Sequence, residues 1–355
     1  MNRSRTLACC TALVALQGCS TLGYYLQAVQ GHLGIMERAH PIQDTIAQTD
    51  TPGSLRERLE RVLVIREFAS RELALPDNGS YRSYADLGRP FALWNVFVAP
   101  EFSVQPKESC LLFVGCVSYR GFYSEQEARS HAAKLAKEGN DAYVGGVPAY
   151  STLGFFNDPV LNTFVRAPEP EVARLIFHEL AHQVVYVRDD TAFNESFASA
   201  VEEEGLRRWL AQQGNASQRA AWEAVQSRRR DFIALVTRYR ERLAEFYARP
   251  ASEAEKRAGK AKLFDEMRRD YQELKKSWGG YAGYDRYFNE QLNNAFLAVV
   301  AAYSVWVPAF SELMRRNGGD MRAFYREVKE LARLGKEGRT ARLSELDPTA
   351  SVPLS

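Results

Sequence analysis

The 355-residue sequence predicts an α+β fold that is predominantly helical, with a small sheet in its first half and a helical second half. Runs of aromatic and β-branched residues, bounded by Pro and Gly, indicate strands at 91–98 and 111–114. Helical periodicity recurs in four long segments after residue 216. A hydrophobic share of 46% and a charged share of 25% are typical of a globular chain.

The first half is expected to open with helices at 24–48 and 55–73, and Pro76-Asp77-Asn78-Gly79 ends the second of them. The two strands follow. Ser124 and Glu127 then form a capping box that opens a further helix, which Gly139 ends, and a strand is expected at 142–144.

A largely apolar helix is predicted at 171–187, because Pro168 and Pro170 stand at its opening and acidic residues favour the positive end of its dipole. Residues 188–191 break this helix, and Asp190 or Thr191 caps a second one that runs to about residue 210. The later helices are expected at 217–249, 253–277, 287–307 and 321–334.

These two consecutive helices carry residues suited to bind a metal ion. His178 and His182 stand four residues apart, which places both imidazoles on one helix face, within reach of a single ion. Glu195 lies in the first turns of the second helix and can fold back toward them. Three protein ligands leave a fourth position for water, as in catalytic zinc sites. The sequence therefore predicts one Zn²⁺ per chain, held by His178, His182 and Glu195.

Glu179, beside the first ligand, is the candidate general base. In the expected mechanism zinc polarises the scissile carbonyl, and Glu179 deprotonates the bound water and later passes the proton to the leaving amine. The alternative is that both histidines are satisfied core residues and that Glu195 is a solvated helix acid.

The N-terminus has the pattern of a cleaved signal. Arg3 and Arg5 precede an apolar run at 7–16, which is shorter than the roughly 20 residues that span a bilayer. Leu16-Gln17-Gly18-Cys19 resembles the lipobox of bacterial lipoproteins, so residues 1–18 are expected to be removed and Cys19 to become the lipidated N-terminus. Ser20 resembles the residue found in lipoproteins of the outer membrane, with the remaining chain facing the periplasm.

Cys110 and Cys116 are the cysteines left for pairing, and an oxidising compartment permits a disulfide between them. Six extended residues span about 20 Å, so a bond needs a chain reversal between them. Two separate buried thiols are the alternative.

Removal of residues 1–18 deletes two arginines and no acid, which takes the formal charge from +2 to 0. No basic field for nucleic acid is left, so no nucleic-acid role is expected. The oligomeric state cannot be read from the sequence.

The strings HELAHQ at 178–183 and NESFASAVE at 194–202 are similar to those of the gluzincin zinc aminopeptidases, which carry HELAHQ and then NEGFASY. The resemblance implies a zincin-like fold and makes Glu195 the third zinc ligand. Twelve residues separate His182 from Glu195, fewer than in those enzymes. The GAMEN-like strand whose Glu holds the substrate amine in those enzymes is replaced here by residues 145–152, which contain no acid.

The chain also resembles the bacterial lipoprotein "putative aminopeptidase" family throughout its mature length. The matching segments are 24–27, 119–121, 149–154, HELAHQ and 292–295. This resemblance implies peptide-bond hydrolysis, and the substrate is expected to be a peptide.

Residues 145–152 are expected to form an edge strand that offers backbone hydrogen bonds to an extended peptide. Asp158 or Glu202 is a candidate to hold a substrate amine, with a turn before Pro159 as the plainer interpretation of Asp158. Asn294 could orient substrate or bridge helices. The substrate-binding candidates are Gly146, Ala149, Tyr150, Ser151, Asp158 and Asn294.

The developing oxyanion needs one further donor, for which a tyrosine is expected. Tyr303 and Tyr287 are the candidates from the helical half, although Tyr303 also fits an apolar stripe with Leu292, Phe296 and Val299.

The predicted organisation is a signal segment at 1–18, a zincin-like catalytic part at 19–215, a helical part at 216–345 and a loose tail at 346–355. A zinc-dependent aminopeptidase is the function expected. A zinc endopeptidase, an amide hydrolase, or a non-catalytic, membrane-tethered binding lipoprotein are the alternatives.

Overall fold

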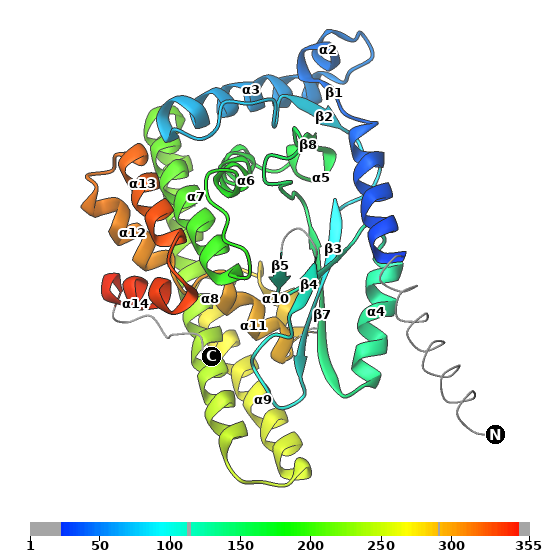
Figure 1. Ribbon diagram of the computed structural model, residues 1–355, viewed down its shortest axis with the longest axis vertical. Coiled ribbons are helices and arrows are strands. Elements are labelled where there is room, and N and C mark those ends of the chain that lie inside the picture. The colour runs from blue at the N-terminus through cyan, green and yellow to red at the C-terminus, as the bar shows by residue number, and fades with distance from the viewer. Residues whose placement is uncertain (1–22, 112–114, 290–291, 348–355) are drawn as a thin grey trace, which may run out of the picture.

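The computed structural model describes residues 23–111, 115–289 and 292–347. Helices make up most of this part, and three small sheets lie beside them (Figure 1). The predominantly helical α+β class predicted from the sequence is therefore confirmed. The signal segment and Cys19, together with the tail beyond residue 347, lie outside the described residues.

The first predicted helix is broken into separate elements. Residues 23–36 are helical, β1 follows at His40–Pro41, and α2 spans Ile42–Ala47. The prediction of one helix over 24–48 was wrong because Pro41 disfavours helical backbone in the residue before it and has no N–H to donate. Helix α3 spans Gly53–Leu73, close to its prediction, and ends at Ala74 in the left-handed region with φ 50°.

Strand β7 (Asn140–Val147) is an edge strand of the largest sheet. It pairs with β3 (Leu93–Pro100), and β3 pairs on its other side with β6 (Arg120–Phe122), all antiparallel. Helix α4 (Glu125–Lys137) lies along this sheet (Figure 1) and begins where Ser124 accepts a hydrogen bond from the Glu127 N–H. A second sheet joins β1, β2 (Ser83–Ala85) and β8 (Val160–Leu161).

The strand predicted at 111–114 falls mostly on residues 112–114, which lie outside the described part. The flanking residues form an antiparallel pair, β4 (Ser109–Leu111) and β5 (Gly115–Val117), in which Cys110 stands opposite Cys116.

Two consecutive helices follow the short α5 (Asn162–Val165): α6 (Glu169–His182) and α7 (Thr191–Gln213). Helix α6 ends five residues before its predicted end at Val187. Its last turn tightens, with the Val184 N–H bonded to the Ala181 carbonyl, and the Asn194 side chain then binds both the N–H and the carbonyl of Val187 at 2.7 Å. Asp190 caps α7, as one of the two predicted candidates.

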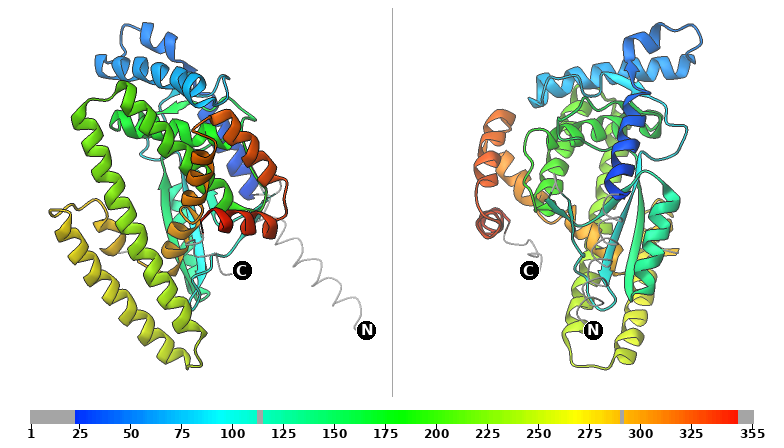
Figure 2. Two further views of the ribbon diagram at one scale, coloured as in Figure 1. Left: turned by 90° about the vertical axis from the view of Figure 1, so that its left-hand side faces the viewer. Right: turned by 45° about the vertical axis from the view of Figure 1, so that its right-hand side comes forward.

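The helical half contains more helices than the periodicity indicated. Helices α8 (Ala216–Ala248) and α9 (Glu253–Ser277) match two predictions and form a long hairpin that projects from the rest of the molecule (Figure 2). The single helix predicted at 287–307 is wrong, because the chain forms α10 (Asp285–Asn289) and α11 (Asn294–Ala302), and Asn293 caps α11. Helix α13 (Met321–Ala332) was predicted, whereas α12 (Val307–Arg316) and α14 (Lys336–Leu346) were not.

The largest apolar cluster joins α3, α6 and α7 to α12, α13 and α14. The two predicted parts on either side of residue 215 therefore share a core. Gly205 of α7 permits close packing there, because a Cβ at this position would lie 2.7 Å from both Leu73 and Phe177. The residue after Phe177 is His178, so this packing fixes the helix that carries the two histidines.

Candidate metal centre

The structure brings His178, His182 and Glu195 together between α6 and α7. The Nε2 atoms of the two histidines lie 3.2 Å apart. Glu195 Oε2 lies 3.3 Å from His178 Nε2 and 3.8 Å from His182 Nε2. Four-residue spacing on α6 and the first turn of α7 bring these three atoms together, as the sequence predicted.

This donor set fits a divalent ion of the zinc type. Ligand bonds of about 2.1 Å in tetrahedral geometry put neighbouring ligand atoms about 3.4 Å apart, close to the observed separations. Within the described residues, this trio is the one group of three or more His, Cys, Asp or Glu residues suited to hold a metal ion. All three side chains are largely buried, so that little water competes with an ion for their ligand atoms.

Glu202, seven residues after Glu195 on α7, braces the first histidine. Its Oε2 accepts a hydrogen bond from His178 Nδ1 at 2.8 Å and a second from Arg174 at 2.9 Å, while its Oε1 contacts Arg229 at 3.1 Å. The bond at Nδ1 leaves Nε2 of His178 facing the ligand cluster. The Glu202 carboxylate is thus already bound by His178 of α6 and by two arginines. These contacts argue against the alternative assignment of Glu202 as the acid that holds a substrate amine.

The surroundings favour positive charge at His178. Burial lowers the pKa of this imidazole, but its hydrogen bonds to Glu195 and Glu202 outweigh burial and raise the pKa to about 10. Burial lowers the pKa of His182 to about 4, so this ring is neutral at pH 7, as a metal ligand must be. A divalent cation would place positive charge where the two carboxylates already stabilise it.

The Glu202→Gln variant is expected to bind zinc about 10- to 100-fold more weakly than the wild type, because the carboxylate partner that orients His178 is lost. Zinc affinity measured by competition with a chelating dye tests this. Glu203→Gln, the adjacent change on α7, is the control because Glu203 contacts Arg229 and is 33% exposed. Equal zinc affinity in both variants would contradict the bracing role.

Glu179 is buried on the same helix, 8% exposed, next to the first ligand. Burial is the main cause that raises the pKa of Glu179 to about 7, and the carboxylates of Glu195 and Asp158 raise it further against the opposing effect of His178. A carboxyl group with a pKa near neutral can both accept and return a proton at physiological pH.

Several tyrosines lie close to these carboxylates. Burial and the charges of Glu195 and Glu179 raise the pKa of both Tyr303 and Tyr119. Tyr81, buried and with its hydroxyl unpartnered among the described residues, is subject to the charges of Glu179 and Asp158. Tyr287 instead stacks on Phe296 and packs in the aromatic cluster of α8, α10 and α11. The contacts therefore favour Tyr303 over Tyr287 as a residue of the site.

The edge strand predicted at 145–152 is wrong in its bounds, because β7 ends at Val147, before Pro148, and residues 148–152 form no strand. Gly146 of β7 stands opposite Trp94, and a Cβ here would lie 2.4 Å from the Phe91 ring. Ala149 is buried in the main core. The Tyr150 hydroxyl lies 2.8 Å from His32 Nδ1, and Ser151 Oγ accepts the Leu153 N–H, so both polar groups shape the loop that follows the strand.

Asp158 lies at the end of this loop with one carboxylate oxygen free of partners. Its Oδ2 accepts the Thr152 N–H at 3.0 Å, whereas Oδ1 is buried and has no hydrogen-bond partner among the described residues. Burial raises the pKa of Asp158 to about 6 against the effect of that hydrogen bond. The backbone of Asp158 is fixed to Ser80 and Tyr81, and Gln183, directly after the second histidine, donates to Ser80 Oγ at 3.2 Å.

Tyr81 is the residue near the site that sequence reasoning missed. Its φ of 61° lies in the left-handed region, which is costly for a tyrosine and is found preferentially at functional positions. Buried Arg66 holds the loop before it through the carbonyls of Pro76, Asn78 and Ser80. No spacing rule relates Tyr81 to the HELAH motif, so only the folded chain reveals that they are close.

Asn294 bridges structural elements. Its amide donates to the Glu101 carbonyl at 2.9 Å and its Oδ1 accepts the Tyr247 hydroxyl at 3.1 Å. The side chain is fully buried, so the contacts favour the bridging role over substrate binding.

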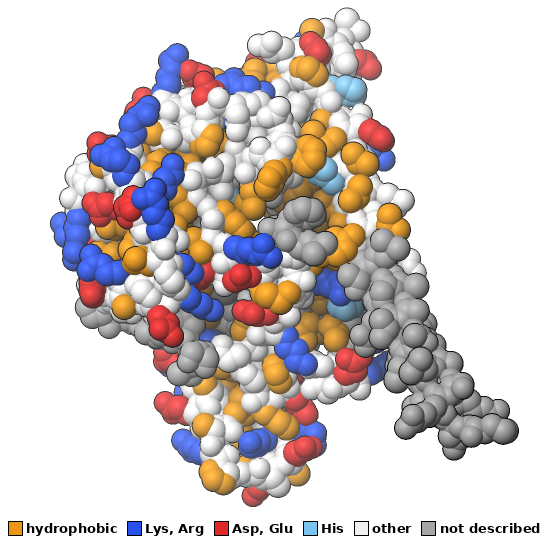
Figure 3. Space-filling model, in the orientation of Figure 1, with side chains coloured by type: hydrophobic (Ala, Val, Ile, Leu, Met, Phe, Trp, Pro, Cys, Tyr) orange, Lys and Arg blue, Asp and Glu red, His pale blue; other side chains and the backbone are white. Residues whose placement is uncertain are grey.

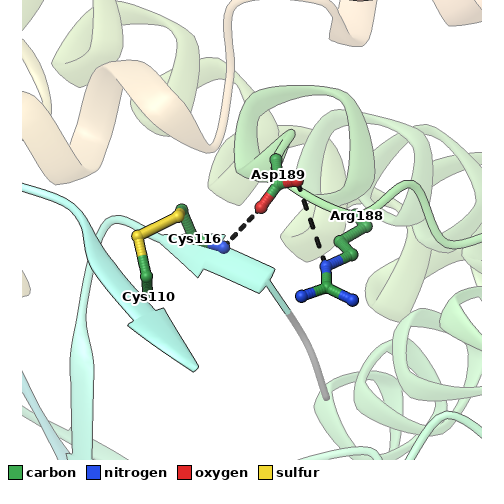
Figure 4. The surroundings of a disulfide bond; sticks show 4 residues. All are labelled: Cys110, Cys116, Arg188 and Asp189. Atoms are coloured by element: carbon green, nitrogen blue, oxygen red, sulfur yellow. Dashed lines mark hydrogen bonds and ion pairs between the residues drawn. A yellow bond between two sulfur atoms is a disulfide. The ribbon is translucent and has the colours of Figure 1, made fainter. Parts of the chain in front are cut away.

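Cys110 and Cys116 form a disulfide across the β4–β5 pair (Figure 4). The two strands run antiparallel, with Cys110 directly opposite Cys116, as the bond requires. The Cys116 N–H donates to Asp189 Oδ1 at 2.6 Å, which attaches the hairpin to the loop between α6 and α7 (Figure 4). Gly115 permits this approach, since a Cβ there would lie 2.4 Å from atoms of Arg188 and Asp189.

Comparison with known proteins finds one matching family model. The family model described as "Putative aminopeptidase" matches residues 23–343, which covers nearly all of the described chain. No curated protein and no solved structure matches the sequence. Since the match extends over far more than half of the sequence, the chain belongs to the "Putative aminopeptidase" family.

Proposed function

We propose that this protein is a zinc-dependent aminopeptidase that cleaves peptides with a free N-terminus. Membership of the family supports peptidase activity in general. The observation that carries the metal-dependent mechanism is the cluster of His178, His182 and Glu195 beside the buried carboxyl of Glu179. A zincin-like arrangement of α6 and α7 is part of this proposal.

His178, His182 and Glu195 would hold the ion. When bound, such an ion lowers the pKa of water and polarises a carbonyl group. Glu179 accepts the proton of the attacking water and returns it to the leaving amine, for which a pKa near neutral is suited. Tyr303, whose pKa is raised by burial and by Glu195 and Glu179, donates a hydrogen bond to the developing oxyanion.

Strand β7 would hold the peptide backbone. It is an edge strand of the sheet β6-β3-β7, and the part of its edge beyond Ala142, whose carbonyl accepts the Asn293 amide, can add an extended peptide by backbone hydrogen bonds. The loop after β7 then carries the chain to Asp158, so a peptide on this edge would have one end near that residue. The strand thus places a backbone-binding element and a carboxylate on one continuous segment.

Asp158 is our candidate for the group that binds the substrate amine. A buried carboxylate oxygen without a partner is costly unless a ligand satisfies it, and Oδ1 of Asp158 has no hydrogen-bond partner in the described part of the chain. Burial and the carboxylates of Glu179 and Asp158 raise the pKa of the unpartnered Tyr81 hydroxyl, which therefore lies near Asp158. An ammonium group offers three N–H donors and a positive charge, which suit a carboxylate and a hydroxyl oxygen.

Free and N-acetylated versions of one peptide test this proposal. The wild type is expected to cleave the free peptide at least about 10-fold faster, because acetylation removes the charge that Asp158 binds. In Asp158→Asn the kcat/KM for the free peptide should fall by about 10- to 100-fold, a loss of roughly 1.4 to 2.8 kcal/mol of binding, while slow cleavage of the acetylated peptide is unchanged.

Asp77→Asn is the matched control, since the Asp77 side chain is 70% exposed in the loop before Tyr81. Cleavage of both peptides at equal rates by the wild type would exclude aminopeptidase specificity and favour an endopeptidase or amide hydrolase. Cleavage of neither peptide would favour the non-catalytic binding role.

The cellular location remains a proposal from the N-terminal sequence. We propose that Cys19 carries a lipid anchor that holds the protein at the outer membrane, facing the periplasm. In the described residues, no helix combines the length and the apolar character needed to cross a bilayer.

A further inference from the structure

Five large apolar side chains are exposed on one side of the protein. Leu26, Val29 and Leu33 of the helix at 23–36 are 52%, 55% and 50% exposed, and Phe155 and Phe156 of the loop before β8 are 78% and 50% exposed. Every large hydrophobic side chain that is at least half exposed among the described residues belongs to this set, which we call the apolar face. The other exposed ones, such as Val64 and Leu334, lie singly elsewhere.

The two segments of the apolar face form one surface. His32 joins them, because its ring lies 4.5 Å from the Phe156 ring and its Nδ1 lies 2.8 Å from the Tyr150 hydroxyl. Hydrophobic side chains gather in this region of the molecular surface, around a histidine, over the N-terminal helix (Figure 3). Such contiguous apolar surface is unusual on a protein that has no partner there.

The helix presents this face because its other side is already bound. Gly31 packs on Tyr123, since a Cβ there would lie 2.2 Å from that ring, and Gln27 accepts the Tyr123 N–H at 3.2 Å. Leu26, Val29 and Leu33 follow helical spacing and point away from this contact. A helix that packs on the protein with one side and faces water with the other would be expected to carry charged residues on its outer side.

Charge is absent from both segments. Residues 23–36 contain no Asp, Glu, Lys or Arg, and neither do residues 148–157. Both segments therefore lack the charges that would keep their exposed side chains in water. This composition suits an apolar environment.

The start of the chain indicates which apolar environment is present. Cys19, the proposed lipidation site, precedes the helix by four residues, which span at most about 14 Å. A lipid anchored at Cys19 would hold the first turn of the helix next to the bilayer. We propose that the apolar face lies in the interface of the membrane that holds the N-terminus, so that Phe155 and Phe156 face the lipid.

Site-specific fluorescence tests this orientation in the full chain, produced as a lipoprotein and placed in vesicles of phosphatidylethanolamine and phosphatidylglycerol. Leu33→Cys and Phe155→Cys are each labelled with an environment-sensitive dye, and Val64→Cys on α3, with Val64 44% exposed, is the matched control. Cys110 and Cys116 are bonded to each other, so they do not take the label.

The dyes at positions 33 and 155 are expected to shift to shorter wavelength and to lose most of their emission when the lipids carry bromine on their acyl chains. The dye at position 64 should retain its emission. Equal quenching at all three positions would overturn the proposal. A shift that depends on protein density rather than on lipid would identify a second copy as the occupant, and a shift caused by added peptide would identify substrate, and either result also overturns it.

The mass of the N-terminal peptide separates this proposal from that of the lipid anchor. Where Cys19 is not acylated, the same measurement is made with C19S as background, so that the dye reports only positions 33 and 155, and quenching there still supports the apolar face. Acylated protein without quenching overturns the orientation and leaves the anchor in place.

Discussion

The Glu179→Gln variant is expected to lose peptide hydrolysis by about 10²- to 10⁴-fold in kcat/KM, while its zinc content stays that of the wild type. Glutamine has nearly the shape of glutamate but cannot accept the proton of the attacking water. Glu179 is buried beside His178 and is absent from the group of three ligand residues, so the exchange leaves the metal-binding atoms unchanged. Steady-state kinetics and metal analysis of one preparation measure both effects.

Glu273→Gln on α9 is the control for the same chemical change, because Glu273 is 71% exposed and pairs only with Lys276 in the described structure. It should keep wild-type kinetics. More than a tenth of the wild-type rate in Glu179→Gln would refute the role of Glu179 as general base, and loss of zinc in that variant would make it a structural residue.

Chelation of the metal is expected to abolish hydrolysis, and added zinc to restore it. Activation of water and polarisation of a carbonyl by a cation contribute several kcal/mol, which corresponds to about a thousandfold or more in rate. The Tm should fall with chelation, since a ligand that binds only the folded state stabilises it. Activity assays and thermal unfolding before and after chelation measure these effects.

Glu195→Gln should not recover activity with added zinc, because the anionic ligand is gone. Glu203→Gln on the same helix should recover it fully. Full activity in a chelated sample shown by metal analysis to be metal-free would refute the metal-dependent mechanism. Restoration by manganese or cobalt but not by zinc would change the identity of the ion and leave the ligand set intact.

Local rules accounted for several elements of this fold. Ser124 and Asp190 were predicted as helix caps because a capping side chain bonds an N–H only two or three residues away, and both do so in the structure. The restriction of these rules to neighbouring residues also explains the two wrong helix predictions. Pro41 and Asn293 interrupt segments whose apolar periodicity otherwise continues, and a hydrophobic pattern does not distinguish one long helix from two short ones.

The hydrogen-bond partners of two asparagine side chains could not be predicted from neighbouring residues alone. Asn194, beside the candidate ligand Glu195, binds the backbone N–H and carbonyl of Val187 and so fixes the loop between α6 and α7. The sequence left open whether Asn294 orients substrate or bridges helices. Its contacts are with Glu101 and Tyr247, which come from distant parts of the chain. Amide side chains can satisfy either role, so their type alone could not decide.

The sequence by itself determined which three residues form the candidate metal site, His178, His182 and Glu195, and that Glu179 stands beside them, because four-residue spacing on a helix and a short connection to the next helix are local geometry. Only the tertiary structure decided that Glu202 braces His178, and that Tyr81 and Asp158 meet near Glu179. These residues come from segments far apart in the chain and converge because Arg66, Ser80 and Gln183 fix their loops by buried hydrogen bonds. Such long-range contacts follow from packing of the whole core, which no short pattern encodes.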